Sequence, residues 1–253
     1  MSGRLTIVGL GPGAPELVTP LASEALACAT DLVGYGPYLA RVPERPGQRR
    51  HASDNRQELT RAREALALAG EGCEVAVVSS GDAGVFAMAS AVFEAIETGE
   101  AAWRGIAVSV VPGISAMFAA AARVGAPLGH DFCVISLSDN LKPWELVLRR
   151  IEAAATADFV IALYNPASKA RPWQLGEALS LIARYRPAST PVIFASAVSR
   201  PEEKIEISTL GSCDPASADM STVVIVGSSA TRVIAREEGA PLVYTPRRAE
   251  VPA

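Results

Sequence analysis

Short apolar runs alternate with segments of helical periodicity along this chain. The run at residues 5–8 precedes helical spacing over 21–29, and the run at 74–78 precedes helical spacing that ends near residue 97. Uninterrupted apolar runs of this length are typical of strands buried on both faces, as in parallel sheets. The alternation therefore predicts an α/β fold. In the first half, strands and helices are expected at residues 5–8, 21–29, 31–35, 57–69, 74–78, 87–97, 106–111 and 117–124.

The second half has a more antiparallel pattern. Residues 204–209 alternate between apolar and polar side chains, which suits antiparallel pairing. The sequence thus predicts two α/β domains, the first with a mostly parallel sheet and the second with a mixed sheet. The break at Gly125–Gly129 sets the expected boundary, with domains at residues 1–125 and 126–253. Further elements are expected at 132–137, 143–155, 159–164, 171–185, 191–197, 221–227 and 242–245.

The composition indicates a globular protein. Of 253 residues, 49% are hydrophobic and 20% are charged, and the formal net charge is −4. A negative balance argues against a nucleic-acid partner. No uninterrupted apolar run reaches the length of about 20 residues that spans a bilayer, and Met1–Arg4 leads directly into the first strand. We therefore expect a cytoplasmic protein without a signal peptide or membrane partner.

The cysteines and histidines do not suggest a metal site. Zinc sites use closely spaced cysteines and histidines. Here the only histidines are His51 and His130, and no Cys-x-x-Cys pair occurs. We expect reduced, mostly buried thiols and no bound metal. The cysteines are Cys28, Cys73, Cys133 and Cys213.

The glycine-rich stretch after the first strand has two interpretations. Gly9, Gly11 and Ala14 fit the dinucleotide-binding pattern G-x-G-x-x-G/A, which would indicate a nicotinamide-dependent oxidoreductase. However, Pro12 and Pro15 lack the N–H groups that a pyrophosphate needs. The helix is expected to begin only at Thr19–Pro20, and no acidic residue ends the strand at 31–35. These departures argue against the dinucleotide interpretation.

Three glycine-bearing turns are expected to share one edge of the first sheet. They follow the strands at 5–8, 74–78 and 106–111. In an open parallel sheet such turns lie at the carboxyl ends of the strands, where ligands bind. The turns alone would also suit a nucleotide-binding module without catalytic activity.

The three turns together resemble the tetrapyrrole (corrin/porphyrin) methylase family. The resemblance rests on Val8-Gly-Leu-Gly-Pro-Gly-Ala-Pro15, Ser80-Gly-Asp82 and Pro112-Gly-Ile-Ser-Ala116, and it extends over nearly the whole chain. It implies a methyltransferase that uses S-adenosylmethionine (product S-adenosylhomocysteine), two α/β domains with the active-site cleft between them, a small-molecule tetrapyrrole substrate and a homodimer.

Three further stretches resemble one branch of this family. They are Ser79–Gly84, His130–Asp139 and Leu163–Arg171. This branch methylates C17 of precorrin-3B and contracts the ring to precorrin-4 in cobalamin biosynthesis. A methylase for another corrin position, or the counterpart that acts on a cobalt-containing substrate, remains an alternative.

The resemblance also implies which residues bind the cofactor. Asp82 has a plainer alternative, because an aspartate before a helix is commonly an N-cap, and Ser115 could likewise cap a helix. The implied cofactor-binding residues are Pro12, Ser80, Gly81, Asp82, Val85, Ser115, Ala116, Asn165 and Val198.

Ring contraction requires the loss of a hydroxyl proton, which a general base would assist. His130 beside Asp131 is the candidate, although a structural histidine at the domain joint is the alternative. The substrate carries acetate and propionate groups, which guanidinium and ammonium groups bind. Lys169, Arg171 and Arg49 are the expected substrate-binding residues. Nearby arginines with the same potential role, or with an ordinary solvated one, are Arg41, Arg45 and Arg50.

Overall fold

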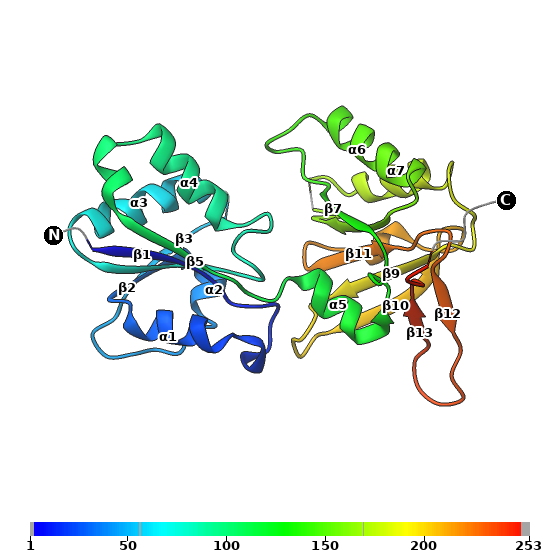
Figure 1. Cartoon of the computed structure of the whole chain (residues 1–253), viewed down its shortest axis with the longest axis horizontal. Coiled ribbons are helices and arrows are strands. Elements are labelled where there is room, and N and C mark those ends of the chain that lie inside the picture. Colours follow the sequence, from blue (N-terminus) through cyan, green and yellow to red (C-terminus); the bar gives the residue numbers. More distant parts are fainter. Residues whose placement is uncertain (1–2, 56, 169, 249–253) are drawn as a thin grey trace. The chain divides into compact units, whose positions relative to one another are not determined.

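The computed structural model describes residues 3–55, 57–168 and 170–248. The chain divides into two compact units, Met1–Ala116 and Met117–Ala253 (Figure 1). The boundary predicted after Gly125 lies at the other end of helix α5 (Ala116–Val124). Side chains tie α5 to the second unit, because the Met117 N–H donates to Tyr164 Oη at 2.9 Å and Arg123 Nε lies 3.0 Å from Glu203 Oε2.

The first unit is built on a five-stranded parallel sheet with the order β3-β2-β4-β1-β5. The prediction of a parallel sheet is therefore confirmed. Its elements are β1 (Arg4–Gly9), α1 (Pro20–Cys28), β2 (Asp31–Tyr35), α2 (Gly36–Leu39), β3 (Arg49–Ser53), α3 (Glu58–Gly70), β4 (Glu74–Ser79), α4 (Met88–Thr98) and β5 (Ala107–Val111), with 3₁₀ turns at Pro15–Leu17 and Ala101–Gly105.

Both faces of this sheet are covered by helices. Successive side chains of a strand point to opposite faces, so Val75 and Val77 of β4 pack with α3 and α4. Ala76 and Val78 pack with α1 and α2 on the other face. Figure 1 shows the two helical layers on either side of the sheet. This burial on both faces explains the uninterrupted apolar runs in the sequence.

Helix α1 begins where the sequence indicated. The Thr19 side chain accepts a hydrogen bond from the Ala22 N–H at 3.1 Å, and Pro20 occupies the first helical position. A threonine cap satisfies one of the free N–H groups of the first turn, and proline has none to satisfy there. Because α1 begins only at Pro20, the first glycine-rich turn leads into a short 3₁₀ turn, Pro15–Leu17, and not directly into a long helix.

Strand β3 was not predicted, because it has no apolar alternation. It is an edge strand beside β2. The Asp31 side chain is fully buried and accepts two hydrogen bonds from Arg49, each 2.8 Å long, while His51 Nε2 lies 2.8 Å from Asp31 Oδ1. Burial works to raise the pKa of Asp31, but the hydrogen bonds from Arg49 and His51 outweigh it and hold that pKa well below its ordinary value. The polar strand is thus attached through a buried carboxylate.

Asp31→Asn is expected to lower the free energy of unfolding by about 1–3 kcal/mol at neutral pH, because it removes hydrogen bonds to charged groups. The folded-state pKa lies below the unfolded value of about 3.9. The carboxylate's contribution is therefore complete above that pH and is lost as the pH falls through the folded-state pKa. Urea unfolding of both proteins across the acidic range should show the difference shrinking. A difference that stays constant down to strongly acidic pH would contradict this assignment.

The second unit contains a five-stranded mixed sheet with the order β10-β9-β11-β8-β7. Residues 204–209 form β10 and pair antiparallel with β9, as predicted. A small sheet, β12-β13-β6, completes the unit. The remaining elements are β6 (Gly125–Ala126), β7 (Phe132–Ser136), α6 (Trp144–Thr156), β8 (Val160–Tyr164), α7 (Gln174–Ile182), β9 (Pro191–Ser196), β10 (Lys204–Thr209), a 3₁₀ turn (Pro215–Ser217), β11 (Thr222–Val226), β12 (Arg232–Ile234) and β13 (Leu242–Tyr244).

Helices α6 and α7 cover one face of the mixed sheet, where Ile161, Leu163 and Phe194 pack against them. The opposite face is also buried, since Val160 and Ile193 are at most 1% exposed. Within the described ranges, no helix has the length and hydrophobicity needed to cross a membrane.

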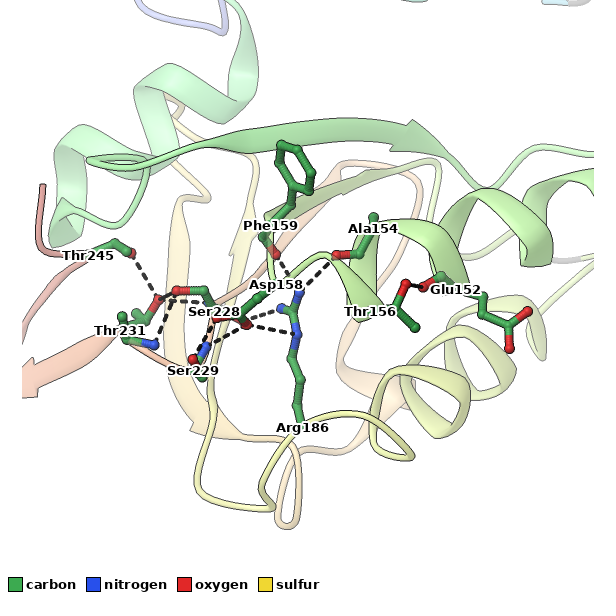
Figure 2. A network of polar contacts seen from close by, with 12 residues as sticks. Glu152, Ala154, Thr156, Asp158, Phe159, Arg186, Ser228, Ser229, Thr231 and Thr245 are labelled. Atoms are coloured by element: carbon green, nitrogen blue, oxygen red, sulfur yellow. Dashed lines mark hydrogen bonds and ion pairs between the residues drawn. The ribbon is translucent and has the colours of Figure 1, made fainter. Parts of the chain in front are cut away.

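A buried arginine joins several backbone segments of the second unit. The Arg186 side chain is 1% exposed and donates to the carbonyl oxygens of Gly227, Phe159 and Ala154. Its Nε lies 3.8 Å from Asp158 Oδ1, and Asp158 in turn accepts the Ser229 N–H at 2.9 Å. Figure 2 shows this network. Arg186 thus ties the start of β8 to the end of β11.

Candidate active site

Three loops come together at the carboxyl edge of the first sheet. We call residues 9–15 after β1, residues 80–87 after β4 and residues 112–115 after β5 the first, second and third glycine loops. The strands β4, β1 and β5 are neighbours, and all three run in the same direction. Parallel neighbours necessarily end at the same edge.

The three loops pack through their backbones. A methyl group on Gly113 would lie 2.2 Å from the carbonyl oxygen of Gly81, and one on Gly9 would lie 2.8 Å from that same oxygen. Gly11 and Gly81 exchange two backbone hydrogen bonds of 3.0 and 2.9 Å. Both have positive φ angles, of 69° and 64°, which glycine adopts without strain. Gly9 and Gly113 are therefore required by the close approach of one loop to another, and Gly11 and Gly81 by their positive φ angles.

Asp82 connects the second loop to the third. Its Oδ1 accepts the Gly84 N–H at 2.8 Å, and its Oδ2 accepts the Gly113 N–H at 3.0 Å. The alternative that Asp82 caps the following helix is wrong, because α4 begins at Met88 with Ala87 as its N-cap. An aspartate whose two oxygens accept backbone N–H groups fixes the geometry of the loops.

The other residues expected at the cofactor lie in the same three loops or directly after them. Pro12 is buried in the first loop. In the second loop, Ser80 Oγ accepts a hydrogen bond from Arg41 at 3.1 Å, and Val85 is half-buried. Ser115 is 3% exposed and precedes Ala116, the first residue of α5. The first unit thus brings together all the expected cofactor-binding residues that it contains.

In the second unit, Asn165 and Val198 lie at one common edge of the mixed sheet. Strands β8 and β9 both pair antiparallel with β11, so they run in the same direction, and the two residues follow their carboxyl ends. Asn165 has a φ of 53° and donates from Nδ2 to Ser136 Oγ at 2.9 Å. Val198 is 4% exposed and lies between Ala197 and Ser199, whose φ angles are 48° and 63°.

Arg171 lies at the same edge and has protein partners. Its guanidinium donates to Asp139 and, at 2.6 Å, to Asn140 Oδ1. Burial works to raise the pKa of Asp139, but the hydrogen bond from Arg171 outweighs it and holds that pKa below its ordinary value. Lys169, the second expected substrate contact, lies outside the described residues.

Two expected residues lie elsewhere. Arg49 begins β3 and is held by Asp31 at the amino end of the first sheet, away from the glycine loops. His130 precedes β7, which runs parallel to β8, so it lies at the opposite end of the mixed sheet from Asn165. Its Nδ1 is 3.9 Å from Asp131 Oδ2, and that aspartate side chain is 82% exposed. Neither residue joins the group described above.

The comparison with known families decides between the interpretations of the glycine loops. The model of the tetrapyrrole (corrin/porphyrin) methylases matches residues 4–214, a range that includes all three loops. The chain belongs to this family. The resemblance seen in the sequence is confirmed, and the dinucleotide interpretation of the first loop is dropped.

Other tetrapyrrole methylases are similar to this chain over nearly its whole length. It is 57% identical over 247 residues to a precorrin-3B C17-methyltransferase of Sinorhizobium sp., an alignment that covers 98% of this chain and 97% of that protein. The solved structure of the methyltransferase CobJ is 52% identical, with a TM-score of 0.92 and coverages of 97% and 100%. The uroporphyrin-III C-methyltransferase of Thermus thermophilus, solved with S-adenosylhomocysteine, shares the fold with 24% identity, a TM-score of 0.65 and coverages of 89% and 97%.

Sequence reasoning missed the roles of Tyr164 and Arg41. Tyr164 accepts the Met117 N–H at the start of α5, directly after the third loop. No sequence signal relates positions so far apart. Arg41 was considered only as a ligand for substrate carboxylates, whereas its guanidinium binds the glycine loops.

Proposed function

We propose that this tetrapyrrole methylase transfers a methyl group from S-adenosylmethionine to C17 of precorrin-3B and contracts the macrocycle to precorrin-4, a step of cobalamin biosynthesis. The similarity to a precorrin-3B C17-methyltransferase over nearly the full length of both proteins carries this proposal. The retention of all three glycine loops supports it, because they form the expected cofactor site.

The glycine loops fit an adenosine-bearing sulfonium compound. A methyl group on Gly81 would have no neighbouring atom closer than 4.0 Å, and the atoms at that distance belong to Ile114, Ser115 and Ala116. In our proposal the lack of a side chain at Gly81 leaves its backbone accessible to a ligand. The absence of N–H groups at Pro12 and Pro15 is tolerable here, because this cofactor has no phosphate. In our proposal Ser80, Gly81, Asp82, Val85, Ser115 and Ala116 border the cofactor together with Pro12.

For methyl transfer, these residues have to hold the methyl donor in a fixed orientation. S-adenosylmethionine supplies a methyl group activated by positive sulfur, and its transfer to a macrocycle carbon leaves the bonding electron pair on sulfur as a neutral thioether. Loops fixed through Asp82 and the Gly11–Gly81 bonds can hold the donor at a constant position. Positioning two reactants in this way contributes about 7–11 kcal/mol to catalysis.

We propose that Asn165 and Val198 also bind the cofactor. Their shared position at the carboxyl edge of β8 and β9 supports this assignment. Ring contraction also needs the loss of a hydroxyl proton. Our proposal leaves His130 out of that role, because it lies at the other end of the mixed sheet. It also leaves Arg49 out of the substrate site, because Arg49 lies at the amino end of the first sheet, opposite the edge that carries the glycine loops.

Arg171→Gln is expected to raise the KM for the tetrapyrrole about tenfold and to leave the KM for S-adenosylmethionine unchanged, because a guanidinium binds carboxylates more strongly than an amide does. Lys169 is also proposed to bind the substrate. Steady-state kinetics with each substrate varied in turn would measure both values. Arg149→Gln, an exposed position on α6, is the control. An unchanged tetrapyrrole KM in Arg171→Gln would remove this residue from the site.

The proposed reaction can be tested with purified substrate. Incubation with precorrin-3B and S-adenosylmethionine should give a product with one more methyl group, and carbon NMR should show a contracted ring. A methylated but uncontracted product would refute the branch and leave the family intact. Preferential turnover of a cobalt-containing substrate would assign the chain to the counterpart enzyme. Thermal stabilisation by NADH, without stabilisation by S-adenosylmethionine or S-adenosylhomocysteine, would refute the cofactor.

We further propose that the protein acts as a cytoplasmic homodimer on a small-molecule substrate. The family resemblance supports the dimer, and the four cysteines, which form no disulfide, are consistent with a reducing compartment. Sedimentation at micromolar concentration would distinguish a dimer from a monomer.

A further inference from the structure

Arg41 is placed rigidly beside the glycine loops. It follows α2, and its backbone N–H donates to Tyr38 O at 3.1 Å. Its neighbours Leu39 and Val42 are 3% and 5% exposed and belong to the core under α1. The backbone of Arg41 is therefore anchored on both sides, so its side chain starts from a defined point.

The Arg41 guanidinium binds two of the three glycine loops at once. Nη2 donates to the carbonyl oxygens of Leu10, Gly11 and Gly13, at 3.2, 3.0 and 3.5 Å. Nη1 donates to Ser80 Oγ at 3.1 Å. The planar guanidinium presents several N–H donors in a fixed arrangement, which a lysine ammonium cannot reproduce. One side chain thus connects the first loop to the second.

We propose that Arg41 is a positioning residue for the cofactor: it holds the first and second glycine loops in the arrangement that binds S-adenosylmethionine. This inference rests on the proposed function. It gives Arg41 a role other than the expected binding of a substrate carboxylate, because its guanidinium connects the first and second glycine loops. Arg41 acts through the loops and is not itself a catalytic residue.

The loops need such a restraint. The first loop contains three glycines, Gly9, Gly11 and Gly13, and glycine loses more conformational freedom on ordering than any other residue. If these loops were ordered only when the cofactor binds, the entropy cost would reduce the affinity. Hydrogen bonds from a charged group to three carbonyls of the same loop order it beforehand.

Arg50 provides a matched control in the same part of the chain. It also donates to three carbonyl oxygens, those of Leu39, Val42 and Pro43, at 2.9, 2.8 and 2.9 Å. All three acceptors lie in the segment that joins β2 to β3. Arg50 therefore stabilises that segment, whereas Arg41 carries its hydrogen bonds across to two glycine loops.

The test compares Arg41→Lys with Arg50→Lys, since both keep the charge and lose the guanidinium. Calorimetric titration with S-adenosylhomocysteine is expected to show about a tenfold higher Kd for Arg41→Lys and the wild-type value for Arg50→Lys. The KM for S-adenosylmethionine should rise by a similar factor in Arg41→Lys. The kcat at saturating cofactor and the KM for the tetrapyrrole should stay near wild type.

A measurement without ligand accompanies the titration. Hydrogen exchange at the amides of Gly11 and Gly81, which bond to each other, should accelerate in Arg41→Lys and not in Arg50→Lys. Faster exchange together with an unchanged Kd would overturn the inference, as would equal losses of affinity in the two variants. Loss of the fold in Arg41→Lys alone would make Arg41 a stability residue and would also overturn it.

The two proposals fail in different ways. A wild-type chain that binds neither S-adenosylmethionine nor S-adenosylhomocysteine would refute the proposed function, and this inference with it. Wild-type binding combined with wild-type affinity in Arg41→Lys would refute the role of Arg41 alone.

Discussion

Gly113→Ala is expected to weaken the binding of S-adenosylhomocysteine and to lower the rate of methyl transfer about a hundredfold, because a displacement of about 1 Å at a positioned site has an effect of this size on the rate. The new methyl group would lie 2.2 Å from Gly81 O and 2.8 Å from the carbonyl carbon and oxygen of Gly9. All three neighbours are backbone atoms, so no side chain can rotate away to make room. The first and second glycine loops would both have to move.

Gly105→Ala is the matched control for this experiment. It precedes β5, the strand that leads to Gly113, and an added methyl group there would meet no atom within 4 Å. Calorimetric titration and thermal unfolding should be measured for both variants. Wild-type affinity in Gly113→Ala would show that the three loops are not the cofactor site.

Arg186→Met should cause the largest loss of stability, about 3–5 kcal/mol, because it leaves several buried carbonyl groups without a donor at about 1–3 kcal/mol each. The carbonyl groups of Gly227, Phe159 and Ala154 would remain in the interior without this donor. For a protein of this size the melting temperature is expected to fall by about 10 °C or more.

Thermal unfolding compared with Arg184→Met would check this expectation. Arg184 is exposed two residues earlier in the chain, and substitutions at such positions usually change stability by less than about 0.5 kcal/mol. Similar melting temperatures for the two variants would mean that the Arg186 network does not stabilise the second unit.

The features that follow from local pattern could be predicted from the sequence. Strands β4 and β11 are buried on both faces, and their apolar runs make them recognisable. Thr19 and Pro20 mark the start of α1, because a cap and a first-turn proline act within a few residues. The glycine loops were recognisable for a different reason, since several motifs occurred together in a fixed order.

The features that depend on distant partners could not be predicted. Strand β3 reads as polar coil until Asp31 is placed beside Arg49 and His51. Arg41 looks like any arginine of a polar loop, because the three carbonyls that it binds belong to another segment. His130 looked functional only because its position relative to the strand ends was unknown. In each case the decisive information is where the residue lies relative to segments that are distant in the sequence.

The positive φ angles of Ala197 and Ser199 have a consequence for the directed evolution of a more thermostable form of this enzyme. A non-glycine residue in the left-handed region costs about 1–3 kcal/mol, and glycine there would remove most of that cost. A screen that rewards survival at high temperature would therefore enrich glycine on both sides of Val198. Such variants would be more thermostable, but the backbone around Val198, a proposed cofactor contact, would be more flexible. Screening for retained turnover in the same round would keep the alanine and the serine.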